Sequence, residues 1–95
     1  MIDVIDDVLI LVSYVSISKY RLKVINNLQE GQVKIPTELA KNSHIRVNHI
    51  SKVLRELKEK GIIECINPDF RKGRLYRLTP LGVTVKKHLN KMREE

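Results

Sequence analysis

The stretch that decides the fold is PTELAKNSHIRVNHISKVLRELKEKG, residues 36–61, followed at residues 70–79 by FRKGRLYRLT. The first segment has the pattern of a short helix, a tight turn and a longer helix with a basic outer face. The second is rich in Lys and Arg and is placed like the tip of a β-hairpin. Together they predict a helix-turn-helix followed by a basic wing, an arrangement that sets one helix in the major groove of DNA.

The residue types within this stretch suit two helices that cross closely. Ala40 is small at the expected crossing point, and His44, which is among the residues that tolerate a left-handed backbone, stands at the turn. Glycine is the easier choice there. Ile45 supplies an apolar plug after the turn, and Ile50 and Val53 supply the inner side of the longer helix.

The outward face of the longer helix, residues 46–60, follows from its inward face. Once the apolar residues point inward, six polar residues near its start point outward. These are Arg46, Asn48, His49, Ser51, Lys52 and Arg55. Arg and Lys can read guanine, Asn can read adenine, and Ser or His can contact base or phosphate. The alternative is an ordinary solvated stripe, but no acidic residue occurs between Glu38 and Glu56.

The expected hairpin tip carries Arg71, Lys72 and Arg74 around Gly73. Basic side chains on such a tip can reach phosphates or an adjacent minor groove. They could instead protect an exposed strand edge from aggregation. The position of the tip after the helix-turn-helix favours contact with DNA.

A helix is expected before this motif, over residues 19–30, with Ser18 as its N-cap and Gly31 at its end. Its expected buried stripe is Tyr20, Val24, Ile25 and Leu28. The short helix of the motif begins at Pro36 and runs to about Asn42.

Two strands and a last helix are expected after the motif. Gly61 ends the long helix, and residues 62–66 and 74–78 form the strands. Thr79 caps a final helix that runs to about Met92. Its apolar stripe is Leu81, Val85, Leu89 and Met92.

Residues 2–17 are apolar at spacings of three and four, which favours a helix, although their β-branched residues would also suit a strand. We interpret them as a helix. Their apolar surface exceeds what one small core needs, which predicts contact with a second subunit. The expected dimerisation residues are Ile5, Leu9, Val12, Leu89 and Met92. The alternative is that this helix completes the core of the monomer.

The predicted fold class is therefore α+β and mainly helical. It is a winged helix-turn-helix with a two-stranded β-hairpin wing and additional N- and C-terminal helices, forming one domain over residues 1–95. In this prediction, residues 1–17 form the N-terminal helix and dimerisation element, residues 18–82 the DNA-binding core and residues 83–95 the C-terminal helix.

The charge distribution supports a polyanionic partner. The net charge is +7, and because residues 1–18 hold three Asp and no Lys or Arg, residues 19–95 carry +10. A solvated surface is the alternative. The single cysteine, Cys65, excludes an internal disulfide and fits a reducing cytoplasm, and its apolar surroundings predict a buried, unreactive thiol. The apolar stretch 8–12 is too short to span a bilayer, and the acidic start does not resemble a signal peptide.

Catalytic and metal-binding patterns are lacking in the sequence. His44, His49, Cys65 and His88 are scattered, without CxxC or HxxxH spacing, which argues against a zinc site. No nucleophile, base and orienting acid can be assembled, and no glycine-rich phosphate loop occurs. The sequence therefore predicts neither an enzyme nor a cofactor.

Residues 18–82 resemble the archaeal and bacterial winged-helix transcriptional regulators of the broad ArsR and MarR type. The matching segments are SKYRLKVINNL, IPTELAKNSHIRVNHISKVLRELKEKGIIE and RKGRLYRLTPLG. An acidic and then apolar N-terminal helix is most similar to small archaeal regulators. The resemblance implies a homodimer on a palindromic site, with the recognition helix at 46–60 and the wing at 67–74. The paired cysteines of metal-sensing ArsR-type members are missing, so metal sensing is not implied, and the chain lacks room for the ligand pocket of larger MarR-type regulators.

The expected function is that of a dimeric, sequence-specific regulator that binds double-stranded DNA in the cytoplasm, with no effector assigned. Two alternatives remain open. One is a protein-interaction module, which would replace the basic face and wing with acidic or apolar patches. The other is a non-specific nucleic-acid-binding protein, which would discriminate little between sequences.

Overall fold

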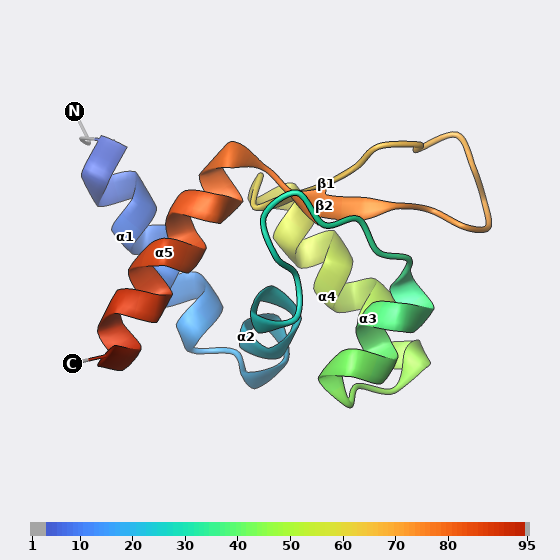
Figure 1. Cartoon of the computed structure of the whole chain (residues 1–95), viewed down its shortest axis with the longest axis horizontal. Helices are drawn as coiled ribbons and strands as arrows, with labels where there is room; N and C mark the ends of the chain where they lie inside the picture. Colours follow the sequence, from blue (N-terminus) through green and yellow to red (C-terminus); the bar gives the residue numbers. More distant parts are fainter. Residues whose placement is uncertain (1–3, 95) are drawn as a thin grey trace.

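The computed structural model describes residues 4–94 and contains five helices and one hairpin in that range (Figure 1). The elements in chain order are α1 (Val4–Ser16), α2 (Lys19–Asn26), α3 (Pro36–Ser43), α4 (Val47–Glu59), β1 (Ile63–Cys65), β2 (Tyr76–Leu78) and α5 (Pro80–Glu94). Helices α1 and α5 lie together at one end of the molecule, and the hairpin loop projects at the other. The predicted mainly helical α+β class and the winged helix-turn-helix order are confirmed.

The N-terminal segment is a helix, which decides between the two interpretations of its apolar pattern. Val8, Val12 and Val15 are buried, and α1 packs against α5 and α2. These three residues recur at spacings of four and three, so they form one face of the helix. The helix forms despite its β-branched residues, because packing of this face against other helices stabilises it.

Helix α2 is shorter than predicted. Ser18 caps it as expected, since its hydroxyl accepts a hydrogen bond from the Arg21 amide, but the helix ends at Asn26 and not near Gly31. The side-chain amide of Asn27 donates to the Lys23 carbonyl at 2.8 Å, and the ammonium group of Lys34 donates to the Asn27 carbonyl at 2.8 Å. Side chains thus satisfy carbonyls that a longer helix would have paired internally.

A second correction concerns Tyr20, which was predicted to belong to the buried stripe of this helix. It is exposed, whereas Val24, Ile25 and Leu28 are completely buried. Tyr20 lies in the first turn of α2, and its ring approaches that of His49 on α4, with 5.9 Å between centroids. The phenol ring of Tyr20 therefore lies beside the first turn of α4 and does not enter the core.

The helix-turn-helix has the predicted geometry. Ala40 is almost completely buried where α3 and α4 pack, and His44 adopts the left-handed conformation with φ 56° and ψ 41°. The amide of Ile45 then donates to the Ala40 carbonyl at 2.9 Å, which closes the end of α3. Ile45 and Ile50 are buried beneath this turn, so the predicted apolar plug and inner face are confirmed.

The hairpin is antiparallel, and Ile63, Glu64 and Cys65 pair with Leu78, Arg77 and Tyr76. The sequence did not predict that the segment before α3 pairs with β2 through an isolated antiparallel bridge. The amide of Lys34 donates to the Tyr76 carbonyl at 3.0 Å, and the Tyr76 amide donates back at 2.9 Å. This bridge ties the base of the wing to the start of the helix-turn-helix.

The junctions around the hairpin are closed by local caps. Gly61, at φ +73°, directly follows the C-cap residue of α4, which is Lys60. The hydroxyl of Thr79 accepts a hydrogen bond from the Gly82 amide at 2.9 Å, so the predicted cap of α5 is confirmed. At Gly82 a Cβ atom would lie 2.0 Å from the carbonyl oxygen of Ile62, so only glycine allows the first turn of α5 to approach the chain before β1 this closely.

The core lies where α1, α2, α4 and α5 meet the hairpin. Its completely buried side chains include Val15, Ile25, Leu28, Leu39, Ile50, Leu57, Ile62 and Val85. The predicted stripe of α5 is buried at Val85 and Leu89 and half-buried at Leu81. Met92, its last member, is exposed, because it lies beyond the part of α5 that the core residues cover.

Candidate nucleic-acid interface

The outward face of α4 is the first component of the candidate interface. All six residues predicted to face outward are exposed, namely Arg46, Asn48, His49, Ser51, Lys52 and Arg55. Arg46 is the N-cap residue of α4, and the other five lie in its first three turns. The burial of Ile50, Val53, Leu54 and Leu57 on the opposite side holds this orientation.

The amino terminus of α4 is electrostatically suited to an anion. Its first turn contains no acidic residue, and the positive end of the helix dipole lies there. Arg46, the N-cap residue directly before this turn, adds a guanidinium group at the same end of the helix. A phosphate approaching this end would meet both the backbone amides and a cationic side chain.

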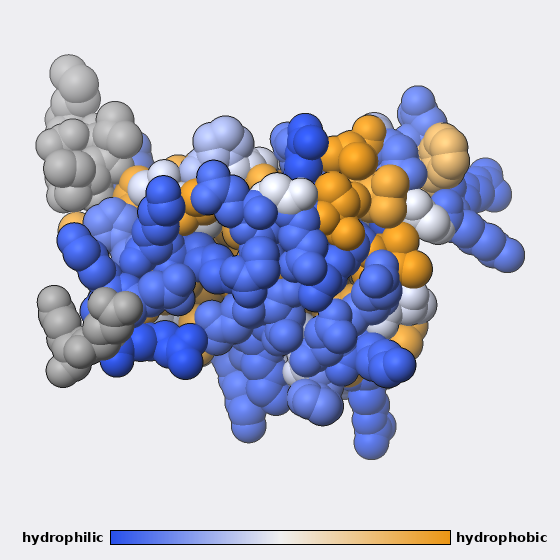
Figure 2. All heavy atoms as spheres, viewed as in Figure 1, coloured by the Kyte–Doolittle hydropathy of each residue, from blue (hydrophilic) through white to orange (hydrophobic). Residues whose placement is uncertain are grey.

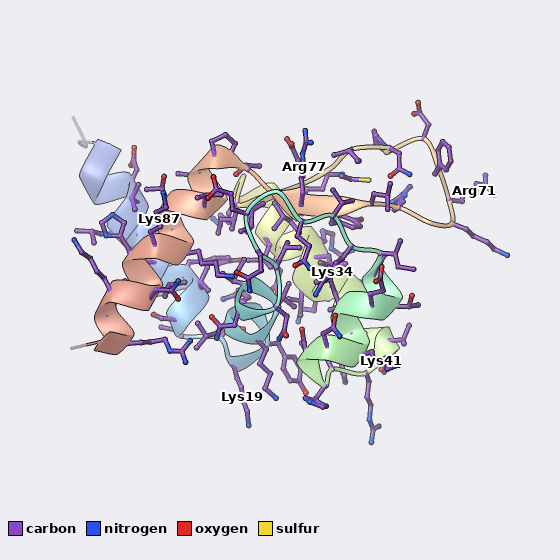
Figure 3. All side chains as sticks on the ribbon, in the orientation of Figure 1. Lys19, Lys34, Lys41, Arg71, Arg77 and Lys87 are labelled. Carbon is purple, nitrogen blue, oxygen red and sulfur yellow. The ribbon has the colours of Figure 1, made fainter. Side chains whose placement is uncertain are left out.

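The wing loop, residues 67–74, is the second component. Arg71, Lys72 and Arg74 are exposed, and Gly73 takes a positive φ of 69° among them. Figure 3 shows Arg71 at the far end of the hairpin, directed away from the body of the molecule. Cationic side chains at this place can reach a phosphate backbone that α4 itself does not touch.

Asn67 organises this loop from within. Its side-chain oxygen accepts a hydrogen bond from the Leu75 amide at 2.7 Å, and its side-chain nitrogen donates to the Gly73 carbonyl at 3.1 Å. Its own carbonyl accepts from the Phe70 amide at 3.1 Å. Asn67 therefore crosslinks both sides of the loop.

A hollow of about 300 Å³ lies between α4 and the wing and joins the two components. Ser51, Arg55 and Lys58 line it from α4, and Arg74 lines it from the wing. In the part of the chain that the structure describes, no Asp or Glu lines this hollow. Lys58 was not among the predicted site residues, although it lies three positions after Arg55 and seven after Ser51, the spacing of one helix face.

Further cationic side chains on the same side of the molecule were also missed. Lys19 at the start of α2 and Lys41 on α3 are exposed, and Figure 3 shows both projecting toward the lower edge of the view. Lys41 belongs to the acid-free stretch 39–55, so its charge was visible in the sequence. The signal for Lys19 and for Tyr20 is tertiary, because the start of α2 lies beside α4 through contacts between distant residues, Tyr20 with His49 and Arg21 with Glu56.

Helix α4 is held against α1 and α2 by Arg21. The Arg21 guanidinium donates to a Glu56 carboxylate oxygen at 3.1 Å and to the Tyr14 carbonyl at 2.9 Å, and it stacks 3.8 Å from the centre of the Tyr14 ring. Its Nε atom is buried and has no partner within the described residues. Arg21 therefore links α1, α2 and α4, which sets the position of α4.

Lys86 on α5 holds the segment that follows α2 in a similar way. Its ammonium group donates to the Leu28 carbonyl at 2.8 Å and to the Gln29 side chain at 3.1 Å. Burial lowers the pKa of Lys86, and the nearby charge of Lys34 lowers it further. These lysines lie behind the candidate interface and are occupied by protein carbonyls, so we do not include them in it.

The predicted dimerisation residues fall into three groups. Val12 and Leu89 are buried in the core of the monomer, whereas Leu9 and Met92 are exposed at the end of the molecule opposite the wing. The side chain of Ile5 lies outside the described residues. Ile10, which was not predicted, is also exposed, so among the described side chains of these two helices the exposed large apolar residues are Leu9, Ile10 and Met92.

The remaining candidates for chemistry are dispersed. Among the described residues, no group of three His, Cys, Asp or Glu side chains is placed to hold a metal ion. Cys65 is half-buried, not fully buried as predicted, and its sulfur lies 3.5 Å from the Asn67 side-chain oxygen at the base of the wing. No helix within residues 4–94 is both long enough and apolar enough to cross a membrane.

Comparison with known proteins supports the fold. No family model matches the sequence, and no curated protein matches it. A crystal structure of a MarR family transcription regulator is similar to this chain, with a TM-score of 0.53 and 22% sequence identity over 80% of this chain. The match covers 50% of that regulator, so the present chain corresponds to about half of it. At this identity the likeness establishes the winged-helix fold.

Proposed function

We propose that this protein is a transcription regulator that binds double-stranded DNA in a sequence-specific manner. Helix α4 enters the major groove, and the wing contacts the backbone or the adjacent minor groove. Bases are read by Arg46, Asn48, His49, Ser51, Lys52 and Arg55. Phosphates are bound by Arg71, Lys72 and Arg74.

The observation that carries this proposal is the hollow between α4 and the wing. It makes one continuous surface of the helix face and the hairpin, with Arg55, Lys58 and Arg74 around it and no acid among its described lining residues. A protein-interaction module that does not bind nucleic acid has no need to concentrate uncompensated cations there. The likeness to a MarR family transcription regulator is in accord with this function.

We further propose that the protein acts as a homodimer through α1 and α5. Leu9, Ile10 and Met92 are 47%, 56% and 56% exposed, and they lie at the end of the molecule opposite the wing. Two such ends packed on a two-fold axis would present the two α4 helices to half-sites about one DNA turn (~34 Å) apart. Replacing Ile10 by Asp is expected to give a folded monomer in sedimentation equilibrium, and a variant that remains dimeric would contradict this assignment.

Binding to duplex DNA at several salt concentrations tests the function. If a dimer neutralises about six to ten phosphates, its affinity should fall about 10³- to 10⁵-fold between low and moderate salt. Lys52→Ala should weaken binding, whereas Lys87→Ala, which removes an exposed lysine on α5, should not. Failure of the unchanged protein to bind any duplex at low salt would refute the DNA-binding function.

Sequence specificity is tested by Asn48 and Arg71. Duplexes recovered from a random pool by the protein are compared with an unselected duplex of equal length. Asn48→Ala should cost about 1–3 kcal/mol on the recovered duplex and little on the other, whereas Arg71→Ala should weaken both equally and lower the salt slope by about 1. Equal affinity of the unchanged protein for both duplexes would favour the alternative, a non-specific nucleic-acid-binding protein.

A further inference from the structure

We propose that Phe70, at the tip of the wing, is an apolar wedge that contacts the bases or sugars of the minor groove and bends the DNA. The inference rests on the proposed function. It adds one residue, Phe70, and an apolar contact with DNA beyond the electrostatic contacts of the basic side chains. Phe70 is the only phenylalanine of the chain, and 60% of its surface is exposed.

The exposure of Phe70 follows from the construction of the loop. Its amide donates to the Asn67 carbonyl, and its own carbonyl accepts a hydrogen bond from the Arg74 guanidinium. Both backbone polar groups are therefore engaged inside the wing loop, and Asn67 crosslinks the same loop through its side chain. The ring is held outside the protein by an ordered backbone, which reduces the ordering needed when a partner binds.

The neighbours of Phe70 indicate the chemistry of that partner. Arg71 and Lys72 follow it directly, Arg74 binds its carbonyl, and Asp69 is the one acidic residue of the wing loop. An aromatic ring beside three cations suits a surface that offers both phosphates and flat apolar groups. Duplex DNA offers both, since phosphates line the minor groove and base steps open onto its floor.

A second exposed apolar surface needs to be distinguished from this tip. Val33 and Ile66 are exposed at the base of the hairpin, where Figure 2 shows hydrophobic side chains gathered on a largely hydrophilic face. Arg71 and Lys72 directly follow Phe70, whereas residues 62–69, which contain Ile66, include no Lys or Arg. Ile66 is therefore the matched control, an exposed apolar residue on the same hairpin that lies outside the basic tip.

The position of the tip relative to α4 favours the minor groove. The loop extends away from the helices, and Arg71 lies at its far end (Figures 1 and 3). With α4 in a major groove, a projection of this kind reaches the groove on the other side of the phosphate backbone. Aromatic side chains inserted there unstack a base step and bend the duplex by about 20–90°.

The test uses the full chain and a duplex of about 30 base pairs, long enough for two half-sites, recovered from a random pool. End-to-end energy transfer reports bending, and 2-aminopurine placed along the duplex reports unstacking. The unchanged protein should shorten the end-to-end distance and raise the fluorescence at one step per half-site. Phe70→Ala should abolish both signals and weaken binding about five- to hundredfold, the effect of losing one base–aromatic contact.

Salt dependence separates the wedge from a charge effect. The loss caused by Phe70→Ala should be the same at low and high salt, whereas Arg71→Ala should lower the salt slope. Phe70→Trp should keep bending, and Ile66→Ala should leave binding and bending unchanged. Normal bending and affinity in Phe70→Ala would overturn the wedge while leaving the DNA-binding function intact. Absence of duplex binding by the unchanged protein would overturn both.

Discussion

The ion pair between Arg21 and Glu56 is predicted to stabilise the fold far more than the other ion pair that the structure describes. The Arg21 and Glu56 side chains are 15% and 25% exposed, whereas those of Arg77 and Glu64 are 48% and 43% exposed. Water screens the exposed pair, which should contribute about 0.2–1 kcal/mol. The partly buried pair should show a coupling energy of about 1–3 kcal/mol, because less water screens the attraction between its two charges.

Two double-mutant cycles measure this difference within one chain. The first combines Arg21→Ala with Glu56→Ala, and the second combines Arg77→Ala with Glu64→Ala. The free energy of unfolding is obtained from urea denaturation followed by circular dichroism. The Arg77–Glu64 cycle is the matched control, because the same two residue types lie 2.7 Å apart there but on an exposed sheet edge.

Single substitutions should follow the same order. Arg21→Ala also removes the hydrogen bond to the Tyr14 carbonyl and the stacking on the Tyr14 ring, so it should lower the free energy of unfolding by about 2–3 kcal/mol. This loss is smaller than that for a fully buried ion pair, because the Glu56 carboxylate remains partly solvated. In a domain of this size that corresponds to a decrease in Tm of about 10–20 °C. A coupling energy for Arg21 and Glu56 no larger than that of the control pair would refute the reasoning.

Three further predictions concern the framework around the site. Gly82→Ala should destabilise the protein by about 3 kcal/mol or more in urea denaturation, because its Cβ would lie 2.0 Å from the Ile62 carbonyl oxygen; a loss below about 1 kcal/mol would contradict this close approach. His44→Gly should stabilise the protein by about 0.5–1 kcal/mol, since glycine adopts the φ of 56° without steric cost, and an unchanged Tm would argue against strain there. The pKa of Lys86 is lowered in the native protein, so just below pH 10.5 the unfolded chain binds more protons than the native one. The free energy of unfolding should therefore rise with pH in that window, compared with the Lys86→Met variant. Parallel curves of unfolding free energy against pH for the two proteins would refute this.

The helix-turn-helix could be predicted from the sequence because its determinants are local. The turn depends on His44 and on a hydrogen bond between Ile45 and Ala40, five residues apart. The caps at Ser18 and Thr79 each involve an amide three residues further along the chain. Interactions over such short separations are encoded by residue type and spacing, which is why these elements were predicted at their correct places.

The outward face of α4 could be predicted for a related reason. A helix with four buried apolar residues at spacings of three and four leaves only one set of positions for solvent, and all six predicted residues are exposed. Tyr20 and Met92 show where the same reasoning fails. Each continues an apolar stripe by spacing but lies beyond the surface that neighbouring elements cover, so spacing alone does not decide burial.

The sequence by itself therefore determined the order of the elements, the turn, the caps and the charge of the face and the wing. The tertiary structure alone decided the length of α2, the bridge between Lys34 and Tyr76, and the hollow that joins α4 to the wing. It also decided the position of α4 against α1 and α2, through a contact between Arg21 and Glu56, 35 positions apart. The segment after α2 is held by Lys86, which lies 58 positions from its acceptor, the Leu28 carbonyl. These features depend on groups that meet only after the chain has folded, because no residue pattern within a few turns of helix specifies which distant carbonyl or carboxylate a side chain will reach.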